Sequence, residues 1–283
     1  MLRGRYALGI ALALSAAWWA PSAAPQQQAL TCAQIEDFLR NANIGAMRDL
    51  PVGVTVPKRA TLSDGRLKHD ASIQTIRDSK ASYQTPRRTY LNFKDWWDFN
   101  VAGYELAKLL DLNMVAPYVE RKTGGKSGSF SWWIDGMLER ERMQKNIQPP
   151  ETERWNRQMY VVRAFNELIA NSDANLTNFI ITPDWQIWMI DFTRAFLTNK
   201  DLESPKNLVQ CDRKLLANLR ALDRKAVEEK LVKPKYLNKM ELDGLMARRD
   251  KIVKFFDDEI NKKGEAAVLF DLDRVGQPCG LGL

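Results

Sequence analysis

Residues 171–193 read NSDANLTNFIITPDWQIWMIDFT, and this is the most informative stretch of the chain. Two apolar runs are separated by Pro and Asp at 183–184, a pattern typical of two β-strands joined by a turn. Such a hairpin returns the chain to its starting point, so the sequence predicts that Asp173, Asn178 and Asp191 lie at one end of it. The stretch therefore predicts a cluster of two carboxylates and an amide.

These three side chains suit phosphoryl transfer. That reaction uses one carboxylate to orient the acceptor hydroxyl, and an amide with a second carboxylate to hold a hard divalent cation against nucleotide phosphates. The sequence predicts Asp173 in the first role, with Asn178 and Asp191 as metal ligands. An alternative is that these Asp and Asn residues only form turns, which they commonly do.

The spacing of the three residues resembles that of the atypical kinase superfamily, which includes phosphoinositide kinases, HipA-like kinases and secretory-pathway kinases. In phosphoinositide kinases a metal-binding Asn and a metal-binding Asp follow the catalytic Asp at the same offsets as Asn178 and Asp191 follow Asp173. Phe192 and Thr193 stand where that family has Phe-Gly. The resemblance extends more loosely over residues 44–196, and the whole also looks like a family of exported bacterial proteins.

The resemblance implies a bilobal kinase-like α+β fold, with a small β-rich N-lobe and a larger helical C-lobe. It also implies a metal-dependent phosphotransferase that moves the γ-phosphoryl group of ATP, or of another nucleotide, to an unidentified hydroxyl on a protein, lipid or sugar. The cofactors would be the nucleotide and Mg²⁺ or Mn²⁺. One rival is a pseudokinase that binds a nucleotide or another ligand as a scaffold without transfer, and a second is a cleft for a different phosphate-containing ligand.

The sequence departs from a working kinase in the N-lobe, where a Lys contacts the phosphates and an acid holds that Lys. Alignment on residues 71–74 places Gln74 at the Lys position and Asn100 at the acid position. Two amides can hydrogen-bond each other, but they supply no positive charge. The candidate substitutes are Lys58, Lys68, Arg59 and His69, with Asp98 and Glu105 as candidate partners.

The adenine ring would lie at the interlobe hinge. Residues 103–117 resemble the helix and strand that lead toward it, and residues 128–134 resemble the strand that enters it. This places Trp132 and Trp133 among the candidate cofactor-binding residues. Packing in the core or hinge is the alternative role for both.

Composition excludes several other classes. His69 is the single histidine, so a histidine-rich metal site is impossible, and a Ser-His-Asp hydrolase would have to use it without a G-x-S-x-G motif. The net charge of +7 is mild, and Lys and Arg are mixed with acids along the chain, so we expect no nucleic-acid partner.

Residues 1–24 have the charged, apolar and small-residue order of a secretory signal peptide, with Arg3 and Arg5 before the apolar run. The sequence therefore predicts an exported, periplasmic or secreted protein without a stable membrane span after cleavage. An uncleaved membrane anchor is the alternative.

The three cysteines permit one disulfide in an oxidising compartment, and the sequence does not choose the pair among Cys32, Cys211 and Cys279.

The expected organisation is a signal peptide at 1–24, a helical extension at 25–43, an N-lobe through the hinge at 44–134, and a C-lobe at 135–283. Apolar periodicity predicts helices at 33–42, from about 96 to 110, at 153–170 and through the last third. We expect strands at 52–56, 71–76, 115–121, 129–134, 179–182 and 186–190, and a polar loop at 80–92.

Overall fold

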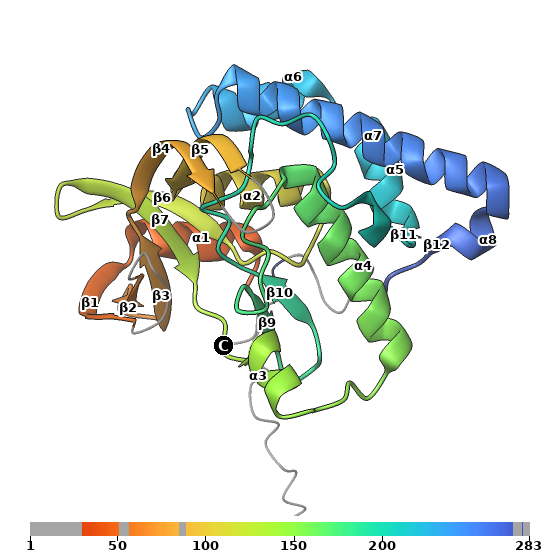
Figure 1. Ribbon diagram of the computed structural model, residues 1–283. Coiled ribbons are helices and arrows are strands. Elements are labelled where there is room, and N and C mark those ends of the chain that lie inside the picture. Colours follow the sequence, from red (N-terminus) through yellow and green to blue (C-terminus); the bar gives the residue numbers. More distant parts are fainter. Residues whose placement is uncertain (1–29, 51–56, 85–88, 274–278, 280–283) are drawn as a thin grey trace, which may run out of the picture.

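The computed structural model describes residues 30–50, 57–84, 89–273 and 279 (Figure 1). Its first half is built on an antiparallel five-stranded sheet with the order β1-β2-β3-β7-β6. The strands are β1 (Asn43–Asp49), β2 (Lys58–Ser63), β3 (Lys68–Gln74), β6 (Tyr118–Thr123) and β7 (Lys126–Trp132). Gly124 and Gly125 both take positive φ in the tight turn from β6 to β7, a conformation that favours glycine. The β-rich first half is confirmed.

Two helices pack against β6 and β7. They are α1 (Cys32–Asn41) and α2 (Asp98–Leu109). Thr31 caps α1 in a reciprocal capping box with Gln34, and the buried face of this helix contains Ile35, Phe38 and Leu39. The expected helix at 33–42 is therefore confirmed, and it forms part of the packing of the small sheet.

The expected loop at 80–92 was wrong. The structure has an antiparallel hairpin there, formed by β4 (Arg77–Gln84) and β5 (Thr89–Trp96). Most of its residues are exposed on both faces, so the alternation of apolar and polar residues that reveals a half-buried strand is missing. The hairpin is anchored at its base, where the backbone N–H of Trp96 donates to the carbonyl of Thr193 at 2.8 Å.

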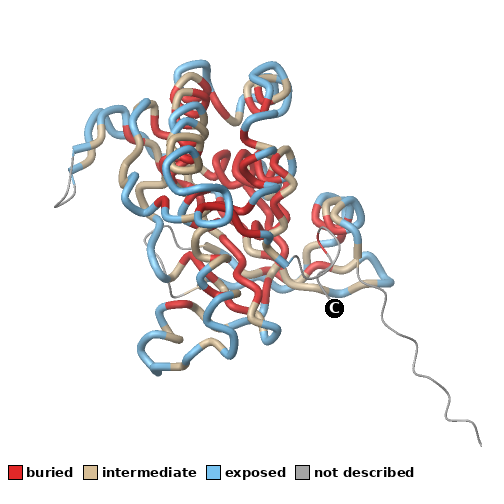
Figure 2. The backbone as a smooth tube through the Cα atoms, turned by 90° about the vertical axis from the view of Figure 1, so that its right-hand side faces the viewer, coloured by how far each residue is buried: buried red, intermediate tan, exposed pale blue. Residues whose placement is uncertain are grey.

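The second half is mainly helical and holds the larger core. Its helices are α3 (Glu139–Gln144), α4 (Thr152–Ile169), α5 (Arg213–Ala221), α6 (Arg224–Val227), α7 (Lys239–Lys263) and α8 (Glu265–Val268), with short 3-10 and π segments at Pro205–Asn207 and Glu228–Val232. The long α7 runs across the top of Figure 1, over α4 and α5. Figure 2 shows the buried backbone gathered in the interior and the exposed residues around it. The helices predicted at 153–170 and in the last third are confirmed.

Two small sheets complete the second half. One has the order β10-β9-β8 and contains β8 (Met137–Leu138), β9 (Phe179–Ile181) and β10 (Ile187–Met189). The other pairs β11 (Cys211–Asp212) with β12 (Leu269–Phe270) in parallel. The β-hairpin predicted around Pro183 and Asp184 is therefore present. The proposed signal peptide at 1–24 and the expected strand at 52–56 lie outside the described residues.

None of the helices within the described ranges combines the length and the apolarity that a bilayer crossing needs.

One disulfide joins the two ends of the described chain. It links Cys32, at the start of α1, to Cys279, with a Cα–Cα distance of 4.9 Å. Cys211 is a buried free thiol. The disulfide closes a loop over 247 positions, and the constraint on the unfolded chain grows with loop length.

We predict that replacing Cys32 and Cys279 together by Ser lowers the free energy of unfolding by about 2–5 kcal/mol. Denaturant titration with and without a thiol reductant measures this loss. Reductant should destabilise the wild-type chain and leave the double variant unchanged. Alkylation of Cys32 and Cys279 in natively oxidised protein, without prior reduction, would contradict the pairing.

Candidate functional site

The β9–β10 hairpin places the residue that precedes β9 next to the residues that follow β10. Phe179 pairs with Met189, and beyond this pair the backbone N–H of Ile190 donates to the carbonyl of Asn178 at 3.0 Å. Asp191 follows immediately. Asn178 and Asp191 therefore leave the same end of the hairpin, as the sequence predicted.

Asp173 is held in a tight loop that begins where α4 ends. Its backbone carbonyl accepts a hydrogen bond from Nδ2 of Asn178 at 2.9 Å. The preceding Ser172 donates from both its backbone N–H and its hydroxyl to the carbonyl of Arg194, at 3.2 and 2.8 Å. The loop before Asp173 and the segment after Asp191 are therefore fixed to each other.

Asp191 has a left-handed backbone conformation, with φ of 57°. Its N–H donates to the hydroxyl of Tyr118 at 3.1 Å, and its Oδ1 accepts from the hydroxyl of Thr193 at 3.0 Å. Burial raises the pKa of Asp191, and the nearby charge of Asp173 adds to the rise, while hydrogen bonds from Thr193 and Gln74 oppose it. Two carboxylates thus share one neighbourhood, an arrangement that a cation would relieve.

Gln74 and Asn100 lie together beside this cluster. Nδ2 of Asn100 donates to Oε1 of Gln74 and to Oγ of Ser129, the second at 3.1 Å. The structure therefore contains the amide pair that the sequence suggested. Oδ1 of Asn100 accepts from the backbone N–H of Phe192 at 2.6 Å, a contact that the sequence did not reveal. Asn100 is fully buried, so it joins two sheet strands to the residue next to Asp191.

The helix α2 lies close to residues 191–193, the candidate metal loop, because Gly103 has no side chain. A Cβ at Gly103 would lie 2.8 Å from Cδ2 of Phe192, closer than packed atoms allow. Phe192 is itself buried against the rings of Tyr118 and Phe165.

The structure does not bring Lys58 or Lys68 to this cluster. Lys58 forms an exposed ion pair with Asp49 on the neighbouring strand. Lys68 is exposed at the opposite end of β3 from Gln74, about 20 Å away at the usual rise of a strand. Both were sequence candidates for the phosphate contact. Lys58 lies opposite Ile73, close to Gln74, but its ammonium is paired with Asp49.

The two hinge tryptophans occupy different environments. Trp132 is buried and its ring stacks on the His69 ring at 3.5 Å. Trp133 is half-buried, donates from Nε1 to Asp135 at 2.8 Å, and has the guanidinium of Arg59 over its ring at 4.0 Å. Packing therefore accounts for Trp132, and Trp133 is the more accessible of the two.

His69 is engaged in this packing as well. Its Nε2 lies 2.8 Å from the carbonyl oxygen of Trp133, so this nitrogen donates, and burial lowers the pKa of the imidazole. A donating Nε2 cannot accept a proton from a serine hydroxyl, which argues against the hydrolase alternative.

Sequence reasoning missed Arg194 and Asp95. The guanidinium of Arg194 donates from Nε to Oδ2 of Asp95 at 2.7 Å, and its Nη1 lies 3.5 Å from Oδ2 of Asp173. The position of Arg194, three residues after Asp191, was a signal that could have identified it. Asp95 was missed because residues 80–92, most of the hairpin that carries it, were predicted to be a loop.

The donor set of the cluster fits a hard divalent cation. Nδ2 of Asn178 is used by the carbonyl of Asp173, which leaves Oδ1 as the oxygen that could serve as a ligand. Asp191 adds a carboxylate, and oxygen ligands of this kind suit Mg²⁺ or Mn²⁺ with nucleotide phosphates completing the coordination.

Comparison with solved structures identifies the fold. A structure of hydra Fam20 with sugar aligns with a TM-score of 0.63 at 14% identity, covering 85% of this chain and 92% of that chain. A Golgi casein kinase structure aligns with a TM-score of 0.61 at 14% identity, covering 87% and 80%. This chain has their kinase-like fold.

A Golgi casein kinase structure with Mn/ADP bound aligns equally well, with a TM-score of 0.61 at 13% identity over 84% of this chain and 78% of that chain. No protein-family model matches the sequence, and no curated protein matches it. The expected α+β bilobal class is confirmed, since the β-rich part and the helical part correspond to those of the Fam20 fold.

We predict that Asn100→Ala lowers the free energy of unfolding by about 1–3 kcal/mol, because it removes the partner of the buried N–H of Phe192 and the donor to Oε1 of Gln74. Urea titration followed by circular dichroism measures this. Asn156→Ala is the matched control, since Asn156 is exposed on α4 and Ala is the better helix former. Equal stabilities of the two variants would contradict the structural role of Asn100.

Proposed function

We propose that this chain is a metal-dependent phosphotransferase that moves the γ-phosphoryl group of ATP, or of another nucleotide, to a hydroxyl of a protein, lipid or sugar. One observation carries the proposal: Asp173, Asn178 and Asp191 meet at one end of a hairpin, in a chain with the fold of Fam20 and Golgi casein kinase. A Golgi casein kinase structure contains Mn/ADP and the hydra Fam20 structure contains sugar, which supports a nucleotide, a divalent metal and a hydroxyl-bearing acceptor as ligands.

Each residue has a distinct role in this proposal. Asn178 and Asp191 would hold Mg²⁺ or Mn²⁺, which neutralises phosphate charge when bound. Asp173 is half-exposed, so its carboxylate can accept a hydrogen bond from an acceptor hydroxyl that enters from solvent. The hydrogen bond from Asn178 to the Asp173 backbone sets the distance between the acceptor side and the metal side of the site.

The nucleotide would lie between a N-lobe of residues 44–134 and a C-lobe of residues 135–283. The adenine ring is proposed at the hinge beside Trp133, the more accessible of the two hinge tryptophans. Gln74 would contact the metal loop through its hydrogen bond to Asp191 rather than through a charge.

We also propose that the protein acts outside the cytoplasm, in the periplasm or as a secreted protein. The order of charged, apolar and small residues in the first 24 positions supports this. The Cys32–Cys279 disulfide adds independent support, because structural disulfides persist in oxidising compartments.

We predict that Asp191→Asn weakens binding of the Mn²⁺–nucleotide complex at least tenfold, since an amide supplies no negative charge to the cation. Isothermal titration with Mn²⁺ and ADP measures the affinity. Asp184→Asn makes the same chemical change at an exposed position in the turn of the same hairpin and should bind as the wild type does. Unchanged affinity in Asp191→Asn would sink the metal assignment.

We predict that Asp173→Asn lowers turnover by about 10²–10⁴-fold with little change in nucleotide affinity, because Asp173 orients the hydroxyl and does not hold the metal. The measurement is phosphate release or transfer by purified mature protein with Mg²⁺ and with Mn²⁺. Asp184→Asn again serves as the control. Nucleotide binding by the wild type without any transfer would overturn the catalytic part of the proposal.

A further inference from the structure

The nucleotide phosphates need a cation that the usual N-lobe position does not supply. Kinases place a Lys on the phosphates and hold it with an acid from the adjacent helix. Here the corresponding residues, Gln74 and Asn100, are neutral amides bonded to each other. The ammonium of Lys58 is paired with Asp49, and Lys68 lies at the far end of β3 from Gln74, so a different side chain has to supply the positive charge.

Arg194 is placed to provide this charge. Its Nη1 lies 3.5 Å from Oδ2 of Asp173, the residue proposed to orient the acceptor. Its side chain is 18% exposed, so the guanidinium is largely desolvated yet reachable. Within the described residues, no ion pair joins a Lys or Arg to Asp191, so Arg194 stands on the acceptor side of the cluster rather than the metal side.

Asp95 holds Arg194 in this position. Its side chain is 8% exposed and lies at the end of β5, just before α2 begins, and its Oδ2 accepts from Nε of Arg194 at 2.7 Å. The rings of Tyr83 and Phe93 lie 6.0 Å from the guanidinium and support it from the same hairpin. A buried acid of the N-lobe thus restrains a cation beside the reacting groups.

We propose that Arg194, positioned by Asp95, contacts the terminal phosphate of a bound nucleoside triphosphate and takes over the task of the missing Lys–acid pair. This inference rests on the proposed function.

The chemistry of the side chain fits that task. A guanidinium stays charged at all physiological pH values and carries five N–H donors, of which the two carboxylate contacts use Nε and Nη1. A phosphate beside Asp173 would meet the remaining donors, and charge-assisted hydrogen bonds of this kind are among the strongest in proteins. The positive charge would also offset the repulsion between Asp173 and the incoming phosphate.

The competing explanation is that Arg194 only ties the β4–β5 hairpin to the second half of the chain. The two explanations differ in how variants respond to the number of phosphates on the ligand. A tether changes the shape of the whole cleft and affects every nucleotide equally. A contact to the terminal phosphate affects the triphosphate alone.

The test is to titrate the protein, in the presence of Mn²⁺, with AMP, with ADP and with a triphosphate analogue whose β–γ bridge cannot be hydrolysed. The affinity for each ligand is measured. Arg194→Gln should weaken the triphosphate analogue by about 10–100-fold, the loss expected for a charged hydrogen bond, and leave AMP and ADP unchanged. Arg194→Lys should recover part of the loss because it keeps the charge. Arg163→Gln removes the same charge from an exposed position on α4 and should bind all three ligands as the wild type does.

A second experiment tests whether a Lys at position 74, where kinases carry the Lys that contacts the phosphates, can replace Arg194. Adding Gln74→Lys with Asn100→Glu to Arg194→Gln should restore part of the triphosphate affinity. Denaturant titration of every variant confirms that the binding differences arise in folded protein.

The outcomes separate the two proposals. Equal losses for AMP, ADP and the triphosphate analogue in Arg194→Gln, or no loss at all, would overturn the role of Arg194 while the wild-type binding still supported the proposed function. Failure of the wild-type chain to bind any of the three ligands with Mn²⁺ would overturn the proposed function and this inference with it.

Discussion

The buried amide of Asn100 is the contact on which the arrangement of the site depends. Asn100 is fully buried, so its polar atoms cannot bond to water and must have hydrogen-bond partners within the protein. The partners are Gln74 on β3, Ser129 on β7 and the N–H of Phe192 in the metal loop. One side chain therefore fixes the sheet, the helix α2 and the backbone beside Asp191 relative to one another. An amide pair also avoids the desolvation cost of burying an ion pair in the same place.

The β4–β5 hairpin gives the two halves of the molecule a second connection besides the hinge. Near Asp95, Nζ of Lys94 donates to Oε1 of Glu241 on α7 at 2.6 Å, and Glu241 is buried. The other oxygen of Glu241 accepts from the N–H of Asn238, which caps α7. The hairpin thus contacts the metal loop through Asp95 and the longest helix through Lys94. The β4–β5 hairpin buries little apolar surface, so ionic contacts at its base hold it in place.

Local patterns were sufficient to predict the parts of the fold that bury a periodic apolar face. The helices α1, α4 and α7 and the β9–β10 hairpin belong to this group. The hairpin brings Asn178 and Asp191 together, and the hydrogen bond from Asn178 to the Asp173 carbonyl adds Asp173. The β4–β5 hairpin could not be predicted, because β4 is exposed almost throughout and only Phe93 and Asp95 of β5 are buried, which leaves little periodic apolar signal. The partner of Cys32 could not be chosen either, since a disulfide depends on the three-dimensional path of the chain.

Lys58 and Lys68 were considered because they lie in the same lobe as Gln74, and the sequence does not show that Lys58 pairs with Asp49 or that Lys68 lies at the far end of β3. Arg194 is distant from Gln74 in sequence, and only the pairing of its side chain with Asp95 shows that it belongs to the site.

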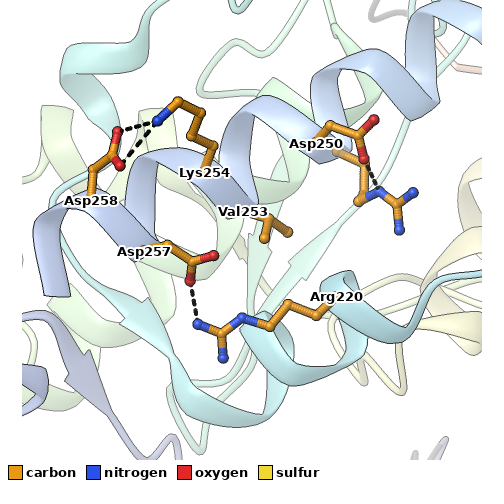
Figure 3. A pocket seen from close by; sticks show the side chains of 7 residues that line it. Arg220, Asp250, Val253, Lys254, Asp257 and Asp258 are labelled. Atoms are coloured by element: carbon orange, nitrogen blue, oxygen red, sulfur yellow. Dashed lines mark hydrogen bonds and ion pairs between the residues drawn. The ribbon is translucent and has the colours of Figure 1, made fainter. Parts of the chain in front are cut away.

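Charge balance distinguishes this site from a groove elsewhere on the molecule. A groove of about 530 Å³ lies between α5 and α7, where Arg220 pairs with Asp257, Lys254 with Asp258 and Arg249 with Asp250 (Figure 3). Each cation in that groove already has an acid, so a charged ligand would have to break an existing pair. At the candidate site, burial and the nearby charge of Asp173 raise the pKa of Asp191, and Arg194 is shared between Asp173 and the buried Asp95. An excess of negative charge held in place by packing is stabilised by a divalent cation, and the cation in turn requires the phosphate oxygens that complete its shell.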